Sequence, residues 1–345
     1  MKTKQLLLLS TTMLFAFICH AQTTITVDNS IGSHAQYSDL QSAISAASNG
    51  DIIQVHPSEI NYGNITIDKE LTLIGFGHSD PDKETKVTDF VLTANASNVS
   101  ISGFHVTDDI YTNSTTTISN LKIENNIIDS TLLFNSAGGA NTVIIRGNII
   151  YQIGSGSTSS NSDNYTNTII SNNIITHYIG LKNHQSITIK NNVFLSPNNS
   201  YPVYNAGDAS GSITVQNNIF YYNSSGVLNP DADGVIFENC LTYNIGTGSV
   251  IALNGSNNLD NQNPNFVSAS DTTFDSETDD YHLQAGSPAI GNGIGGVDMG
   301  IYDGSAFTFN NFGYTNGIPT VKITNITDRI APNANLSVTI NTNAN

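Results

Sequence analysis

Short segments in which apolar and polar residues alternate recur along most of the chain. A representative copy is Ser186-Ile-Thr-Ile-Lys-Asn-Asn-Val-Phe194, in which two apolar positions precede an Asn-Asn pair. A period of two is the pattern of a strand with one buried face. The first residue of the pair is Gly75, Gly103, Asn125, Gly147, Asn172, Asn191, Asn217 and Asn239 in the successive copies. Their irregular steps of 19 to 28 residues predict stacked coils of strands joined by loops of different length.

Three columns of this repeat have a distinct composition. The positions four and two before the first residue of the pair are apolar in nearly every copy, and we expect them to point inward and stack. The first residue of the pair is always Gly or Asn, which adopt a left-handed backbone most readily, so the chain is expected to turn there. The second residue forms the column Phe76, Phe104, Asn126, Asn148, Asn173, Asn192, Asn218 and Cys240. Asparagines in such a column are expected to hydrogen-bond from coil to coil.

This inward asparagine ladder at a tight turn resembles that of the right-handed parallel β-helix proteins of the pectate-lyase-like superfamily. The resemblance covers most of the chain and implies an all-β solenoid of about 8 to 9 coils. It also implies that residues 38–49 form an N-terminal capping helix. The segment from Asp280 to Tyr302 is similar to the closing segment of many exported β-helix proteins.

The local chemistry of residues 38–49 agrees with a helix. Ser38 followed by Gln41 matches a capping box, and Leu40 and Ile44 lie on one apolar stripe. Gly50 stands where the helix is expected to stop.

The two ends of the chain differ from the repeats. Lys2 and Lys4 precede an apolar run over residues 6–18, and Ala21 follows, as in a secretory signal peptide. We therefore expect a signal peptide at 1–21, a β-helix domain at 22–303 and a C-terminal tail of appended strands at 304–345. The protein is then secreted or held at the cell surface or in the periplasm, without a transmembrane segment. A lipoprotein anchored at Cys19 is the alternative.

Composition excludes one large class of partners. The chain carries 11 Lys and Arg against 28 Asp and Glu, a formal charge of −17. Nucleic acid is held chiefly by basic side chains that neutralise phosphates, so it is not an expected partner. The composition says nothing about the oligomeric state.

A second recurrent column precedes Asn135, Asn183, Asn205, Asn229 and Asn254. If Leu133, Leu181, Val203, Val227 and Ala252 point inward, alternation places Phe134, Lys182, Tyr204, Leu228 and Leu253 outside. Aromatic rings offer flat apolar faces to the C–H groups of sugars. We therefore regard Phe134, Tyr178 and Tyr204 as candidate substrate-binding residues. The alternative is that neighbouring loops cover this stripe.

The resemblance also implies a chemistry. β-Helix polysaccharide lyases abstract a proton beside a uronate carboxylate with Lys or Arg, often with Ca²⁺ neutralising that carboxylate. Lys182, next to His184, is the first candidate base, and Arg146 is the second. Arg146 shares its outward column with Glu124, so a plain surface ion pair is the alternative for it.

Acidic loops supply candidate ligands for Ca²⁺, the candidate cofactor. Asp208, Asp231 and Asp233 follow the outward stripe, and carboxylates are preferred calcium ligands. The histidines lack the paired spacing of a zinc site. Cys240 occupies the ladder column and is expected to be a buried, inert thiol.

Two functions follow from these patterns. The first is an exported β-helix protein that engages extracellular polysaccharide, either as a lyase-like enzyme on uronate-containing glycans or by sugar binding alone. The second is a non-catalytic surface rod for adhesion or structure, because no complete catalytic motif is present. The fold does not choose between them, since function depends on the site.

Overall fold

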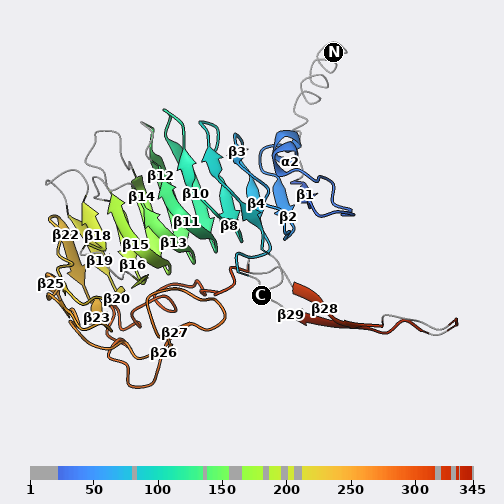
Figure 1. Cartoon of the computed structure of the whole chain (residues 1–345). Helices are drawn as coiled ribbons and strands as arrows, with labels where there is room; N and C mark the ends of the chain where they lie inside the picture. Colours follow the sequence, from blue (N-terminus) through green and yellow to red (C-terminus); the bar gives the residue numbers. More distant parts are fainter. Residues whose placement is uncertain are drawn as a thin grey trace, which may run out of the picture.

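A computed structural model describes residues 22–79, 84–134, 138–154, 165–181, 186–195, 201–205, 212–314, 320–327, 332–333 and 335–343. These residues form a parallel β-solenoid of about eight turns, which confirms the predicted parallel β-helix (Figure 1). No helix within the described ranges is long and apolar enough to cross a membrane. The predicted signal peptide at 1–21 lies outside them.

The solenoid has two long walls, each with its strands parallel. Sheet A contains β1 (Thr24–Val27), β2 (Ile52–Val55), β4 (Thr72–Ile74), β7 (Ser100–Ser102), β10 (Ile118–Glu124), β12 (Ala140–Arg146), β14 (Tyr165–Ser171), β16 (Ile187–Lys190), β19 (Ile213–Gln216), β22 (Val235–Glu238) and β25 (Gly255–Ser256). Sheet B contains β3 (Ile65–Ile67), β5 (Lys86–Val87), β6 (Phe90–Leu92), β8 (His105–Val106), β9 (Ile110–Thr112), β11 (Ile127–Leu133), β13 (Ile149–Ile153), β15 (Ile174–Leu181), β17 (Val193–Leu195), β18 (Val203–Asn205), β20 (Ile219–Tyr222) and β23 (Leu241–Asn244). The strands β21 (Val227–Leu228) and β24 (Ser249–Val250) form a short parallel pair beyond sheet B.

The alternating apolar columns pack inside sheet A as predicted. Leu121 of β10 pairs with Val143 of β12, which pairs with Thr168 of β14, so the same position stacks from coil to coil. Every residue of the two predicted inward columns, from Leu71 to Phe237, is buried. The hydrophobic core is therefore a continuous rod of stacked side chains.

The corner between sheets A and B lies at the predicted Gly or Asn. Seven of the eight predicted corner residues have a positive φ, including Asn125 at 56° and Gly147 at 69°. Gly75 is the exception. A Cβ there would collide with the carbonyl of Gly103, so close approach, rather than a left-handed backbone, requires this glycine. The structure also contains a ninth corner at Asn257, with φ of 56°, which the sequence analysis missed.

A second left-handed corner lies five residues before the first. Asn98, Asn120, Thr142 and Asn167 have φ between 47° and 59°. The amide of Asn120 donates to Asn98 Oδ1 of the neighbouring coil at 2.8 Å. Asn120, Thr142 and Asn167 lie within β10, β12 and β14, whereas Asn98 lies two residues before β7.

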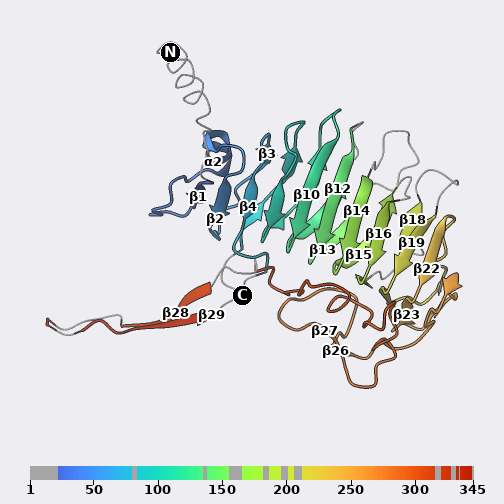
Figure 2. The same ribbon diagram turned by 180° about the vertical axis from the view of Figure 1, so that it is seen from behind.

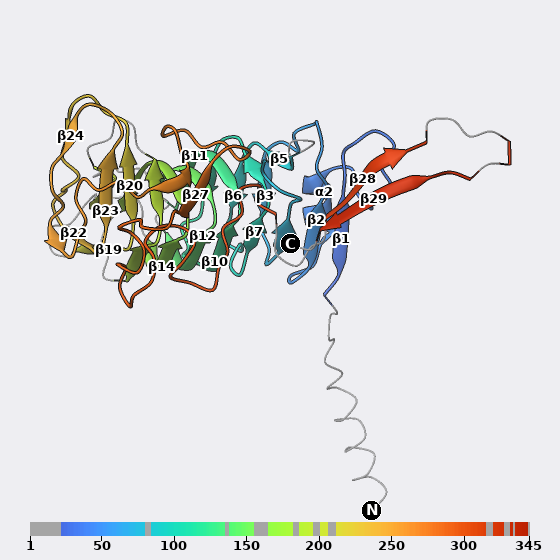
Figure 3. The ribbon, with the colours of Figure 1, turned by 90° about the horizontal axis from the view of Figure 1, so that it is seen from below.

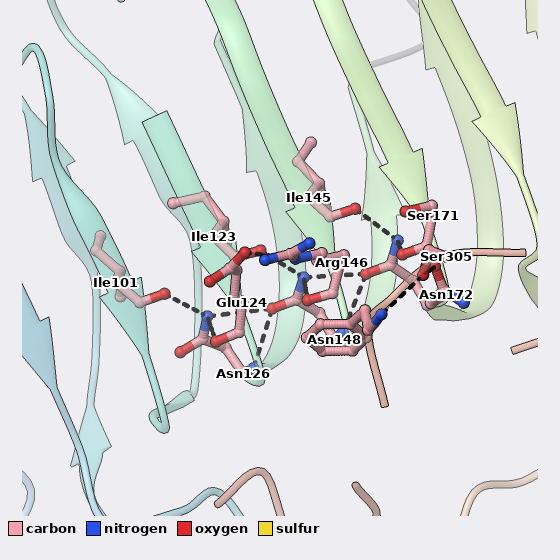
Figure 4. A network of polar contacts seen from close by, with 12 residues as sticks. Ile101, Ile123, Glu124, Asn126, Ile145, Arg146, Asn148, Ser171, Asn172 and Ser305 are labelled. Atoms are coloured by element: carbon pink, nitrogen blue, oxygen red, sulfur yellow. Dashed lines mark hydrogen bonds and ion pairs between the residues drawn. The ribbon is translucent and has the colours of Figure 1, made fainter. Parts of the chain in front are cut away.

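The predicted asparagine ladder is present along the inner edge of the corner (Figure 4). The backbone N–H of Asn126 donates to Asn148 Oδ1 at 3.0 Å, and that of Asn148 donates to Asn173 Oδ1 at 3.0 Å. Each ladder amide also donates to a backbone carbonyl of its own coil and to one of the preceding coil, as Asn148 does to Arg146 and Ile123. Phe76, predicted in this column, is instead half-buried and packs edge-on against Tyr314.

Cys240 ends the ladder as the expected buried thiol. Its side chain is fully buried, and burial raises the pKa of the thiol to about 12.

We predict that iodoacetamide leaves Cys240 unmodified at pH 8 in the folded protein and alkylates it fully in urea. The reason is that the thiolate is the nucleophile, and the raised pKa keeps the buried thiol protonated at pH 8. Mass spectrometry of the peptide containing Cys240 measures this. Alkylation of the folded protein at the rate of a free cysteine would contradict the prediction.

The capping helix is shorter than predicted. It spans α2 (Leu40–Ala46), and Asp39, not Ser38, caps it by accepting from the N–H of Ser42 at 2.7 Å. The helix stops three residues before the expected end because Ala47 leaves the helical backbone with ψ of 153°. Leu40 and Ile44 are fully buried, so the helix covers the end of the core as expected.

Residues 290–314, here called the return segment, run back along the row of corner residues (Figure 2). Asn239 donates to the carbonyl of Asn292, Asn191 to that of Asp298, and Asn172 to that of Ile301, so later residues meet earlier coils. The outward residues just after each corner, such as Ile174 and Ile219, join a second apolar core with Phe307 and Met299. Corner asparagines therefore bind this segment as well as turning the chain.

Two antiparallel hairpins complete the described chain. The first pairs β26 (Phe266–Ser268) with β27 (Asp280–Leu283), and the second pairs β28 (Thr320–Ile326) with β29 (Val338–Asn343). Figure 3 shows the second hairpin projecting from the end of the solenoid that carries α2. The strands β28 and β29 are the appended strands expected in the tail at 304–345. Residues 304–314 of that tail still lie along the solenoid.

Candidate functional site

A hollow of about 510 Å³ lies at the outer face of sheet B, over the middle of β15 and the start of β18. We call it the aromatic hollow. It is lined by His177, Tyr178, Tyr201, Tyr204, Asp231, Ala232 and Asp233. Three phenol rings, an imidazole and two carboxylates therefore line one space, which is large enough for sugar rings.

A bulge in β15 brings the aromatic side chains together. Ile150 pairs with Ile175 and Gln152 pairs with Tyr178, so two residues of β15 stand opposite one residue of β13. One of the two is His177, whose ring stacks on Tyr151 with centroids 4.6 Å apart. Bulges re-aim side chains and recur beside functional sites.

The row of rings continues across the next coil. The ring of Tyr178 lies 4.4 Å from that of His177 and 5.1 Å from that of Tyr204. Gly180 is the partner of Tyr204 in the sheet, so no side chain separates Tyr204 from Tyr178 on this face. The sequence thus builds a ladder of four rings, from Tyr151 to Tyr204, on three neighbouring coils.

The polar side of the hollow comes from the loop between β21 and β22. The N–H of Asn254 donates to Asp231 Oδ1 at 2.9 Å, and the N–H of Asp231 donates to Asn229 Oδ1 at 3.2 Å. These bonds tie the loop to the next coil and hold Asp231 toward the rings. Nδ1 of His177 lies 3.3 Å from Gln152 Oε1, and burial lowers the pKa of this imidazole. A neutral imidazole can accept a proton or a hydrogen bond from a hydroxyl group.

The structure brings together four of the predicted site residues. Tyr178 and Tyr204 point outward and line the hollow with Asp231 and Asp233, although the sequence analysis assigned them to separate roles in sugar and metal binding. Lys182, His184 and Asp208 lie outside the described residues. Their proposed roles stay predictions.

Part of the predicted outward stripe is wrong. Phe134 is fully buried and packs against Tyr165, with ring centroids 5.1 Å apart. Leu228 and Leu253 are buried as well, whereas Val227, expected inside, is 68% exposed. The physical reason is register: the asparagines used to align these strands are not in phase, and a slip of one residue exchanges the two faces of a strand.

Arg146 lies on sheet A, on a different wall from the aromatic hollow. Its Nε lies 2.5 Å from Glu124 Oε1, and its guanidinium sits 4.9 Å from the ring centroid of Phe307 in the return segment. Arg146 thus forms the ion pair with Glu124 that was considered as the alternative for it, and its role as a base stays a prediction.

Three residues of the site escaped the sequence analysis: Tyr151, His177 and Tyr201. A signal for the first two was present. Ile153 follows Asn148 by five positions, whereas its partner Ile179 follows Asn173 by six positions. The extra residue is the bulge that carries His177.

Calcium stays a prediction at this site. Ca²⁺ takes six to eight oxygen ligands, and the described lining offers two carboxylates. Within the described ranges, no group of three or more His, Cys, Asp or Glu side chains is arranged to hold a metal ion. Asp208, the third ligand expected from the sequence, is not among those residues.

The solved structures to which the chain is similar, at low identity, include a pectate lyase and an alginate lyase. The pectate lyase Pel9A is 17% identical with a TM-score of 0.37, over 86% of this chain and 97% of that one. An alginate lyase from Paenibacillus sp. str. FPU-7 is 16% identical with a TM-score of 0.26, over 70% of this chain and 98% of that one. No family model and no curated protein matches the sequence. The assignment as a parallel β-helix therefore rests on the coils, corners and ladder of the chain itself.

Proposed function

We propose that this protein is exported and binds an extracellular polysaccharide in the aromatic hollow. The observation that carries the proposal is the row of rings Tyr151, His177, Tyr178 and Tyr204, of which the last three line the hollow together with Asp231. Sugar rings bind in protein sites by packing their C–H faces on aromatic side chains while polar groups orient the hydroxyls.

A second hollow next to the aromatic hollow provides further surface for a chain of sugars. Tyr151 also borders a second hollow of about 380 Å³, lined by Ile127, Ile128, Asp129, Ile149, Tyr151, Thr176, Thr272, Thr273 and Phe274. The two hollows therefore meet at the stacked pair of Tyr151 and His177 and follow each other along successive coils. A linear polymer lying along the solenoid would contact both.

We predict that Tyr204→Ala weakens retention of the protein in polysaccharide-containing native gels about tenfold, because stacking on this ring is lost. Retardation over a series of polysaccharide concentrations gives the dissociation constant. The matched control is Tyr111→Ala, since Tyr111 is half-buried on β9 of the same sheet but does not line the hollow. Equal retention of wild type and Tyr204→Ala on every retained glycan would refute the proposed site.

The finer proposal, a lyase reaction on uronate-containing glycans with Lys182 as the base, has a separate test. Incubation with such polymers and Ca²⁺ is followed by absorbance at the wavelength of an unsaturated uronate. A signal that Lys182→Ala abolishes supports the lyase. Retention of the glycan without new absorbance supports binding alone.

A further inference from the structure

The charge of the aromatic hollow constrains the sugar that fits it. Its described lining carries two carboxylates, of Asp231 and Asp233, and contains neither Lys nor Arg. A glycan that placed a carboxylate beside these aspartates would bring like charges together without a described cation to compensate. Such juxtaposition opposes binding.

The described basic residues of the solenoid lie elsewhere. Lys122, Arg146 and Lys190 belong to strands β10, β12 and β16 of sheet A. Lys69 donates to carbonyls at the end of α2, including that of Ile44 at 2.9 Å, and Lys86 pairs with Glu84 at 2.8 Å. None of these five basic residues lies at the hollow, so they do not neutralise its two carboxylates. The chain as a whole is also acidic, with a formal charge of −17.

We propose that the aromatic hollow selects a glycan that carries protonated amino groups, such as a polymer of glucosamine. An ammonium group bound there is attracted by the carboxylates of Asp231 and Asp233. The faces of the three tyrosine rings that line the hollow also attract cations. The inference rests on the proposed polysaccharide binding and gives amino sugars as the class bound in the hollow, in place of the uronate-containing glycans of the lyase proposal.

The test compares glycans of cationic, neutral and anionic charge. Glucosamine oligomers, N-acetylglucosamine oligomers of equal length and galacturonate oligomers are titrated into the full-length chain by calorimetry at pH 5.5, at low and high salt. At this pH the amino groups of glucosamine carry a positive charge. We expect glucosamine oligomers to bind at least tenfold more tightly than both others, with an affinity that falls as salt rises.

The matching variant is Asp231→Asn combined with Asp233→Asn. Asparagine at 231 keeps the Oδ1 that accepts from the N–H of Asn254, so the loop is expected to stay in place. The control, Glu59→Gln with Asp68→Asn, removes two exposed charges that do not line the hollow. We expect at least a tenfold loss of affinity for glucosamine oligomers in the first variant and less than twofold in the control.

The outcomes separate this inference from the proposed function. Equal affinity for acetylated and free amino sugars, tighter binding of galacturonate, or equal losses in both double variants would overturn the charge inference. If Tyr204→Ala still weakens binding of the preferred glycan in those cases, the proposed polysaccharide binding is supported. Failure of all three oligomers to bind would overturn the charge inference, and the gel retention of Tyr204→Ala would then decide the proposed function.

Discussion

Replacing Asn173 with alanine is expected to lower the free energy of unfolding by about 3–5 kcal/mol. Its Oδ1 accepts from the backbone N–H and the amide of Asn148, both at 3.0 Å. Its amide donates to the carbonyls of Ile145 and Ser171 at 2.9 Å and to Asn192 Oδ1 at 3.0 Å. Alanine removes every one of these bonds. It also leaves the buried backbone N–H of Asn148 on the neighbouring coil without its acceptor, and an unsatisfied buried group costs about 1–3 kcal/mol.

Urea unfolding followed by circular dichroism measures this loss. Asn64→Ala is the control, because Asn64 is exposed in the loop before β3, and surface substitutions usually change stability by about 0.5 kcal/mol or less. A loss below about 1 kcal/mol for Asn173→Ala would mean that water or a shifted coil replaces the ladder bonds.

The ladder could be predicted because one strong physical constraint acts at each of its positions. The corner needs a residue that tolerates positive φ, and Asn125, Gly147 and Asn172 satisfy it. The next residue is enclosed, and only a side chain that both donates and accepts can serve the backbone of two coils, as Asn148 and Asn173 do. The same residue types therefore recur in register and are visible in the sequence.

Sheet B was predicted less well because its constraints vary from coil to coil. Bulges occur where β11 meets β13 and where β13 meets β15. Because a bulge adds one residue to one strand, the residues after it point to the opposite face of the sheet from the one that strict alternation predicts. Phe134 was misplaced for this reason. The outer face is also divided: the return segment covers Ile174 and Ile219, while Tyr178 and Tyr204 remain at the hollow.

The return segment itself could not be inferred from local pattern. Its contacts join residues more than 100 positions apart, as in the bond from Asn172 to the carbonyl of Ile301. Asparagine at a corner is already explained by the turn, so its second role in binding the return segment leaves no separate signal in the sequence.

The end of the return segment packs on a histidine that must stay neutral. His78 is fully buried, its backbone N–H donates to the carbonyl of Phe312 at 2.9 Å, and Gly313 lies so close to its ring that a Cβ there would collide with it. Nδ1 of His78 lies 2.7 Å from Ser79 Oγ, whereas Nε2 has no hydrogen-bond partner among the described residues. Burial, and secondarily the charge of His105, lower the pKa of His78 to about 3.

The pKa of His105 is shifted in the opposite direction, so its effect on stability has the opposite dependence on pH, and His105 serves as the control. Burial alone would lower its pKa, but its bonds to Asp129 and Glu84, both at 2.8 Å, outweigh burial and raise the pKa above the ordinary value. Its contribution to stability is therefore complete below about pH 6.5 and is lost as the pH rises through the raised folded pKa.

We expect the contribution of His78 to the free energy of unfolding to fall by about 3 kcal/mol when the pH is lowered from 7.5 to 4.5. The unfolded chain protonates this histidine below about pH 6.5, whereas the folded protein resists protonation down to its lowered pKa, so acid favours unfolding. Urea unfolding of wild type, His78→Phe and His105→Gln at both pH values isolates the effect, because the carboxylates titrate in all three proteins. His78→Phe should lose less stability on acidification than wild type, and His105→Gln should lose more. Equal losses in wild type and His78→Phe would show that His78 keeps access to water beneath the return segment.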